Sequence, residues 1–406
     1  APAQAPAYLP PAQAPAAAAP AAPANGNGAA TNGNGCDACA EEKKEEEAPP
    51  APKYLLECLL SDTCFAKKGY KLYGWMEQSY TPSSASHRNN PVALNDIANE
   101  YLLNQVWIGG AKEVDTSKKE FQLGGRIDFF YGSDARYTIP RGLFDYQLRT
   151  PDRNLYDIYQ FYVDAFLPGV GPQGTTVRMG RFATHCSYEV VQGPDTPFVS
   201  RSYGFMFNPF THTGVYAITP LDDDWTISNG VAVGSDNFID PTNRANYIGQ
   251  IKYAPKDGPT QVLFNTVITD PQYNVQEAFT QYNVYNLQVI HKATDKLTYI
   301  LDSTYSHTYD VPGIGFANWY GAVNYFVYNL SDNLSSTSRF ELFDDPQGFR
   351  TGSKGLYTAV TTGLAWKPVD WLMFRPGVRY DINDRSRAFE GDYDLFTAFT
   401  DMIIRW

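Results

Sequence analysis

Histidines, cysteines and clustered acidic residues are the side chains of this chain that could support catalysis or hold a metal. The histidines are spread along the sequence, at His87, His185, His212, His291 and His307. The sequence contains neither a Gly-x-Ser-x-Gly nucleophile elbow nor a His-Glu-x-x-His zinc motif. The acidic run Asp222–Asp224 lacks the ligand spacing of a calcium loop and is typical of a solvated turn. We therefore expect no catalytic residue, no metal site and no cofactor.

Four of the five cysteines precede residue 65, where they form two close pairs. The pair Cys36 and Cys39 lacks the following histidine of a haem-attachment motif and has no histidine cluster as a zinc partner. A disulfide, Cys36–Cys39 or Cys58–Cys64, is the interpretation we favour in an oxidising envelope compartment, with free thiols as the alternative.

The C-terminal stretch DLFTAFTDMIIRW separates charged from apolar residues with a period of two. Every second residue back from the end belongs to one set: Trp406, Ile404, Met402, Thr400, Ala398 and Phe396. The intervening residues form the other set: Arg405, Ile403, Asp401, Phe399 and Thr397. Such a period indicates a strand with one apolar face and one charged face. Taken alone, it fits the wall of a membrane barrel and the edge of a sandwich equally well.

The composition favours strands, and it argues against a helical membrane protein and against a nucleic-acid-binding protein. Aromatic residues make up 15% of the 406 residues and charged residues only 19%. No run of about 18 apolar residues is present, so the sequence offers no transmembrane helix. The mean hydropathy of −0.38 is compatible with barrel strands, which are apolar only at alternate positions. The net charge of −12 disfavours nucleic acid as a partner.

Residues 69–406 contain about 16 strand candidates, an even number as in single-chain bacterial barrels. The candidates cover 69–78, 100–109, 119–132, 156–167, 174–183, 212–220, 224–235, 244–254, 259–269, 282–293, 296–309, 316–330, 333–344, 354–367, 370–381 and 393–406. The short connections are PLDDD, APKDG, ATDK, LSDN and KPVD, with AKEVDTSK less tight. The long connections are 79–99, 133–155, 184–211, 270–281, 310–315, 345–353 and 382–392.

Short and long connections alternate strictly when the chain is followed back from Trp406. A sandwich has no reason to place its tight turns at one end, whereas an outer-membrane barrel has them on its periplasmic side. We therefore predict an all-β fold, a transmembrane antiparallel up-and-down β-barrel over 69–406. The last strand must pair with the first, because an unpaired edge in lipid is too costly.

The alternation assigns side chains to the two faces of the predicted wall. The charges expected to line the pore are Arg126, Asp128, Asp164, Arg178, Asp302, Arg339, Glu341, Arg375, Arg379 and Asp401, with Lys252 and Arg405 on the same face. The two signs nearly balance, so strong ion selectivity does not follow. The aromatic residues expected at the membrane interface are Trp319, Trp366, Trp371 and Trp406. Pro376 deletes a ladder donor and predicts a bulge.

The longest connection, 184–211, carries more aromatic residues than an exposed loop usually does. We expect it to fold into the lumen as a constriction, with packing over the mouth or at a subunit contact as the alternative. The residues expected to act there are Glu189, Asp195, Phe198, Arg201, Tyr203 and Phe210.

The segments before the barrel differ from it in composition. Residues 1–52 are rich in Ala, Pro, Asn, Gly and Glu, cannot bury enough apolar surface to fold, and predict a disordered tether. The opening APAQAPA is typical of a mature chain just after a cleavage site. Residues 53–68 predict one short amphipathic helix, which must pack on the barrel mouth or on a partner.

The region 178–215, RMGRFATHCSYEVVQGPDTPFVSRSYGFMFNPFTHTGV, resembles the second family of β-barrel porins, described as OmpL-like. The matching pieces are Gly180–Phe182, Ser187–Glu189, Pro194–Asp195, Ser200–Tyr203 and Pro209–Val215, together with YGWMEQSYT at 73–81. The family usually has Gly before Tyr-Glu, where this chain has Ser187. The resemblance extends over nearly all of the chain after residue 53, and it implies an outer-membrane barrel and a porin role.

We expect passive diffusion of small hydrophilic solutes or ions across a cell outer membrane. The alternatives are a channel specific for one solute and a structural envelope protein, in which the barrel is an anchor and the tether binds a wall or periplasmic partner. The N-terminus is expected in the periplasm. The expected partners are outer-membrane lipid, the solute and further copies of the chain in a homotrimer, with no nucleic acid.

Overall fold

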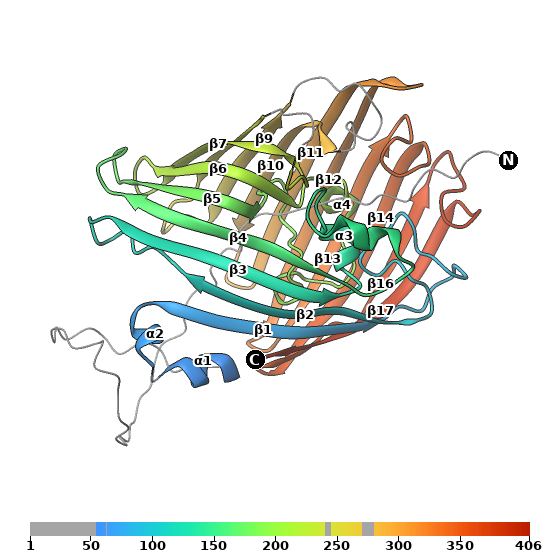
Figure 1. The fold of residues 1–406 in the computed structure, drawn as a ribbon. Coiled ribbons are helices and arrows are strands. Elements are labelled where there is room, and N and C mark those ends of the chain that lie inside the picture. Colours follow the sequence, from blue (N-terminus) through green and yellow to red (C-terminus); the bar gives the residue numbers. More distant parts are fainter. Residues whose placement is uncertain (1–53, 62, 240–244, 270–279) are drawn as a thin grey trace.

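A computed structural model describes residues 54–61, 63–239, 245–269 and 280–406, and it shows a closed β-barrel (Figure 1). The predicted tether, residues 1–52, lies outside the described residues. In the part of the chain that the structure describes, no helix is long and apolar enough to cross a membrane.

The strands follow the expected order along the chain. Their bounds are β1 (Tyr70–Tyr80), β2 (Tyr101–Lys112), β3 (Gln122–Gly132), β4 (Leu155–Leu167), β5 (Thr175–Ala183), β6 (Thr211–Pro220), β7 (Trp225–Ser235), β8 (Asn246–Tyr253), β9 (Thr260–Ile268), β10 (Asn283–Lys292), β11 (Leu297–Val311), β12 (Gly315–Ser331), β13 (Leu334–Asp345), β14 (Gly355–Val369), β15 (Leu372–Phe374), β16 (Gly377–Asn383) and β17 (Asp394–Arg405).

The barrel closes because each strand pairs antiparallel with its neighbours along the chain and β17 returns to β1. The closing register runs from Trp75 opposite Arg405 to Tyr80 opposite Thr400. The labels β15 and β16 mark two pieces of one wall strand, since both pair with β14 and β17. The described wall therefore has 16 strands, and the irregularity predicted at Pro376 is the break between the two pieces.

Alternate residues of each strand face opposite sides, as the period of two predicts. On β17, Phe396 is 48% exposed on the outer face, while Phe399 is 3% exposed on the inner face. The outer face is apolar on the other strands too, with Ile127, Leu342 and Val378 among its exposed residues. The wall thus presents an apolar surface outward and its charged set inward.

The two ends of the barrel differ in their connections. We call the end with Trp406 and the short turns the turn end, and the opposite end, with the long connections, the loop end. One predicted long connection, 310–315, is wrong: β11 continues to Val311 and β12 begins at Gly315, which leaves a tight turn at the loop end. Gly313 and Gly315 adopt positive φ there, which lets the chain reverse over so few residues.

Two short helices replace the single helix predicted over 53–68. They are α1 (Leu55–Ser61) and α2 (Cys64–Lys67), and the Thr63 side chain caps α2 by accepting the N–H of Ala66. The break puts Cys58 and Cys64 on separate helices, and no disulfide joins them in the described structure. The predicted Cys58–Cys64 pairing is therefore wrong.

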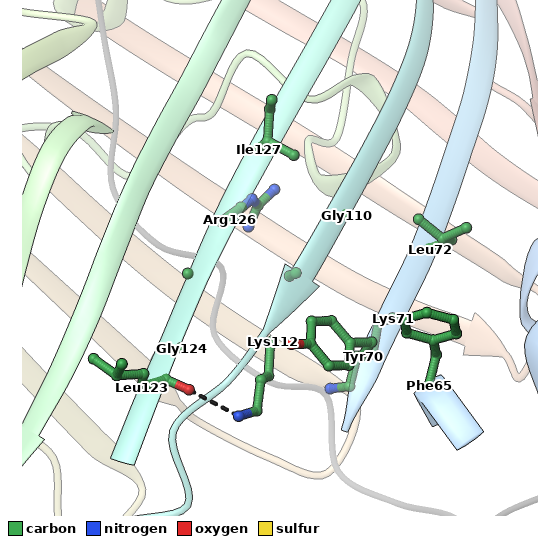
Figure 2. A pocket seen from close by; sticks show the side chains of 12 residues that line it. Phe65, Tyr70, Lys71, Leu72, Gly110, Lys112, Leu123, Gly124, Arg126 and Ile127 are labelled. Carbon is green, nitrogen blue, oxygen red and sulfur yellow. Dashed lines mark hydrogen bonds between the residues drawn. The ribbon is translucent and has the colours of Figure 1, made fainter. Parts of the chain in front are cut away.

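The helices pack beside β1 at the end of the barrel where the chain ends, with α2 against the outer wall. Figure 1 shows α1 and α2 beside β1, near the C-terminus. Phe65 of α2 packs edge-on against Tyr70 at 5.8 Å between ring centroids. Phe65 and Tyr70 border a groove of about 660 Å³ on the outer face of β1, β2 and β3, which Gly110 also lines (Figure 2).

Candidate functional site in the barrel interior

The connection 184–210, between β5 and β6, lies inside the barrel and reaches its far wall. It contains the short helical turns η3 (Gly193–Asp195) and α4 (Tyr203–Met206). The Tyr203 hydroxyl donates to Asp381 of β16 at 2.6 Å, and the Trp319 indole of β12 donates to the Phe207 carbonyl at 3.3 Å. We call residues 184–210 the inner loop.

Aromatic side chains explain why the inner loop leaves solvent. Phe198, Tyr203, Phe205, Phe207 and Phe210 are all buried. Their burial removes apolar area from water, at roughly 25 cal/mol per Å². The expected inward fold of this segment is therefore what the structure has.

A first cluster of ionic contacts fixes the inner loop to the seam of the wall. The Arg375 guanidinium lies 2.6 Å from both Glu77 and Asp401, and it also donates to the loop carbonyls of Gly193 and Thr196 at 2.7 and 2.6 Å. Buried charges are tolerated only when they are paired and hydrogen-bonded, and Arg375 meets both conditions.

A second cluster fixes the loop to β13 and β16. Arg339 contacts Glu189 of the loop at 2.7 Å and Glu341 at 2.8 Å. Arg379 contacts Asp381 and Glu341 at 2.7 and 3.0 Å, and it donates to the loop carbonyl of Arg201 at 2.8 Å. The inner loop is thus held by ionic contacts on two sides.

The burial of these wall charges corrects one expectation. The ten side chains expected to line the pore lie on the inner side of the wall, but eight of them are at most 7% exposed. The eight are Asp128, Asp164, Asp302, Arg339, Glu341, Arg375, Arg379 and Asp401. The inner loop packs against most of these, whereas Asp128 and Asp164 are covered by neighbouring wall residues such as Tyr73, Gln160 and Arg178. Only Arg126 and Arg178 keep substantial exposure, 29% and 23% of their side chains.

Arg201 also differs from its expected role as a fixed charge in the narrow pore. It is buried, and its guanidinium donates to the carbonyls of Val190, Val191, Phe198 and Val199 within the loop. Arg201 therefore holds the fold of the inner loop. The neighbouring Glu189 is also buried, whereas Asp195 is exposed.

The loop half of the interior is packed like the core of a soluble protein. Trp107 stacks between Trp75 and Phe130, at 4.7 Å to each ring. The connections 81–100 and 133–154 add buried residues such as Leu94 and Ile139. In the loop half of the described strands most inward side chains are buried, so this half is packed where the turn half is not.

Trp319 belongs to this core and not to the membrane interface, which corrects its predicted place. It is 1% exposed and packs against Tyr282, Phe349 and the Arg350 guanidinium. Trp366 and Trp371 are 46% and 48% exposed at the turn end, Trp366 on the outer face of β14 and Trp371 in the turn before β15. Trp406 pairs with Gly74, and its indole occupies the space of the missing Gly74 side chain. The interface position of these three remains a prediction.

The turn half of the interior is open. Inward residues such as Tyr73, Tyr162, Lys252 and Arg405 are partly exposed, and Lys367 is exposed. Of the inner loop, only Tyr188, Asp195 and Pro197 escape full burial. The interior is therefore a vestibule that opens toward the turn end and ends at the inner loop.

A clasp between outer connections closes the loop end. Glu390 accepts the backbone N–H groups of Ser86, His87 and Arg88 at 2.9, 3.1 and 2.7 Å. Slight burial acts to raise the pKa of Glu390, but these donors, together with the neighbouring His87 side chain, hold that pKa below its usual range.

Sequence reasoning missed the part that the connections 81–100 and 133–154 play in filling the interior. Apolar residues such as Val92, Leu94 and Ile139 within polar connections were the available signal. The described residues hold no cluster of three or more His, Cys, Asp or Glu side chains arranged for a metal.

The profile of one protein family, described as "Putative beta-barrel porin-2, OmpL-like", matches residues 69–405. The chain belongs to this porin family. The family and the closed barrel make it an outer-membrane porin, a passive diffusion channel. Comparison with curated proteins found no match.

Solved structures similar to this porin include three outer-membrane channels. The channel DcaP of Acinetobacter baumannii is 12% identical with a TM-score of 0.54, over 83% of this chain and 96% of that chain. OmpF of Salmonella typhi, in a complex with daunomycin, is 11% identical with a TM-score of 0.55, over 84% and 99%. An anion-selective porin from Comamonas acidovorans is 9% identical with a TM-score of 0.53, over 83% and 99%. At these identities the likeness concerns the fold alone.

Proposed function

We propose that the inner loop is the element that limits diffusion through this porin. Small hydrophilic solutes and ions enter the vestibule from the turn end. They cross the loop half only when the inner loop is displaced from its packed position. The burial of the loop and of the wall residues behind it is the observation that supports this proposal. The role requires no enzymatic step.

The location of the charges supports a movable loop on a fixed wall. Arg375, Arg379 and Arg339 each keep a wall carboxylate among their partners, so the wall stays paired when the loop moves. The loop itself adds no strand to the ladder, and connections tolerate change far better than strands do.

Shortening the inner loop tests the proposal. Deleting 194–203, PDTPFVSRSY, removes Phe198, Arg201 and Tyr203 and should raise the single-channel conductance in planar bilayers severalfold. Replacing the exposed residues 149–153, RTPDR, by a Gly-Ser stretch is the control and should leave the conductance as it was. A folded, heat-modifiable barrel with unchanged conductance after the deletion would contradict the proposal.

The packed loop half also favours the second candidate, a structural envelope protein with the barrel as anchor. Such a protein would need no path through the barrel. Persistent silence of both the native chain and the shortened chain in the bilayer would support this candidate and exclude the porin role.

We also propose that the turn end and the N-terminus face the periplasm. The helices α1 and α2 lie beside the C-terminal end of β17, at the turn end (Figure 1). Protease added to membranes opened on the periplasmic side should then remove residues 1–52 and leave the barrel intact. Protection in the absence of a wall or periplasmic partner would contradict this orientation.

A homotrimer is the assembly we propose. Gly110 and Gly125 bring no side chain to the groove on the outer face of β2 and β3, which would let another barrel approach closely there. A Cβ at Gly110 would meet only flexible side-chain atoms of Leu72 at 3.3 Å, apart from contacts of ordinary length. Gly110→Leu should therefore leave the barrel folded and reduce the trimer in native mass spectrometry, whereas Ala322→Leu on β12 should not.

A further inference from the structure

Two arginines of the vestibule, Arg126 and Arg178, form salt bridges with carboxylates. In both pairs the arginine side chain is more exposed than the carboxylate. Arg126 lies 2.6 Å from Asp128, which is fully buried and also accepts from Tyr73, Trp107 and Gln160. Arg178 forms two hydrogen bonds with Asp164, at 2.9 and 2.8 Å. The exposed fractions are 29% for the Arg126 side chain against 0% for Asp128, and 23% for Arg178 against 10% for Asp164. A solute in the vestibule therefore meets the guanidinium groups.

Three further cations of the vestibule have no acidic partner among the described residues. They are Lys252 on β8, Lys367 on β14 and Arg405 on β17, each at an inward position. Arg405 stacks over the Tyr54 ring, 4.7 Å from its centroid, which leaves its positive charge in place. No salt bridge with a described residue involves any of the three.

Two carboxylates oppose these cations: Asp195 at the lower surface of the inner loop and Asp370, which acts electrostatically on Lys367. Asp195 is exposed, and Arg405, Arg126 and Lys367 act on it electrostatically together with the buried Arg375. Asp195 and Asp370 together do not balance Lys252, Lys367 and Arg405, so an excess of positive charge remains. The paired Arg126 and Arg178 add to it locally, because their guanidinium groups are more exposed than their carboxylate partners. The acids of the short turns, such as Glu113 and Asp295, lie at the outer rim, where bulk salt screens them and lysines pair with them.

From this charge arrangement we infer that the vestibule selects small anions. The inference rests on the proposed function and names its solute class: inorganic anions and small carboxylates or phosphates. A cleft lined by one sign of charge concentrates ions of the opposite sign, and low-dielectric walls strengthen the effect. A unit charge about 7 Å from an ion changes the local ion concentration by about threefold even in water.

The reversal potential of the full chain in a planar bilayer under a potassium chloride gradient tests the inference. The native channel should pass chloride over potassium. The double change Lys252→Glu and Lys367→Glu should lower the chloride preference by about tenfold. The double change Lys252→Arg and Lys367→Arg should keep it.

A matched control carries the same change of charge outside the vestibule. Lys256→Glu with Lys296→Glu alters two exposed lysines in short turns and should leave the chloride preference unchanged. The shortened inner loop provides a second background for all four measurements, without Asp195. If the channel conducts in both backgrounds but does not prefer chloride, the inferred anion preference is wrong and the porin role stands. If no conductance is measured in either background, both the porin role and the anion preference are wrong.

Discussion

The loop half and the turn half of the barrel carry the same kinds of side chain on the same wall, yet they use them differently. In the loop half, Arg375 is buried and makes several charge-assisted contacts. In the turn half, Arg405 is partly exposed and has no carboxylate partner among the described residues. The inner loop makes the difference, because it covers the first half and stops above the second. An inward charge stabilises structure where it is covered, and it acts on solutes where it is not.

The largest effect is expected from removing Arg375. Arg375→Met leaves Glu77 and Asp401 buried without their counter-charge and should cost about 3–5 kcal/mol of unfolding free energy. Arg405→Met, in the turn half, should cost less than about 1 kcal/mol. Urea titration of the barrel in lipid vesicles measures both changes. Equal costs for the two would mean that the halves do not differ as described.

A second contrast separates the packed core from the outer aromatic residues. Trp319→Ala opens a cavity in the loop half and should cost about 3 kcal/mol in the same titration. Trp366→Ala removes an exposed side chain of the outer face and should cost less than about 1 kcal/mol of unfolding free energy. A larger cost for Trp366→Ala than for Trp319→Ala would show that the lipid contact contributes more to stability than the packed core does.

A third contrast compares a buried charge with an exposed one. Arg201→Gln removes a cation that donates only to loop carbonyls and should cost about 1–3 kcal/mol. It should leave the reversal potential unchanged in potassium chloride, whereas Lys367→Gln should reduce the chloride preference. A shift of the reversal potential by Arg201→Gln would show that the inner loop exposes this charge during conduction.

The smallest effect concerns the clasp at the loop end. The pKa of Glu390 is lowered in the folded barrel, so its stabilising contribution is present above the pKa of the unfolded chain. That contribution is lost as the pH falls through the lowered folded value. The protection of the Ser86, His87 and Arg88 amides, measured as exchange corrected for its intrinsic pH dependence, should therefore fall modestly as the pH drops through the lowered pKa of Glu390. In Glu390→Gln this protection should be low already at neutral pH and vary little with acidification.

The strands and their faces could be predicted because they depend on local alternation. Phe396 and Phe399 fall on opposite faces by spacing alone, and Pro376 breaks its strand because it lacks an N–H donor. Trp319 was misplaced because β12 is apolar on both faces, so the period could not distinguish inside from outside. The cover over Arg375, and the carbonyl partners of Arg201, depend on contacts between distant segments that no local pattern encodes.

The reach of the inner loop has a consequence for the order of folding. Its bond from Tyr203 to Asp381 joins residues 178 positions apart, and its bond from Arg375 to Gly193 joins residues 182 apart. Hairpins between neighbouring strands need no such distant partners. Since contacts with a long sequence separation form slowly, the hairpins should form first, and both docking of the inner loop and closure of the barrel should come later. The closing pair Trp75 and Arg405 lies 330 positions apart, and Arg375 contacts both Glu77 at this seam and Gly193 of the loop, so the last steps of folding would join the seam and the filling of the lumen.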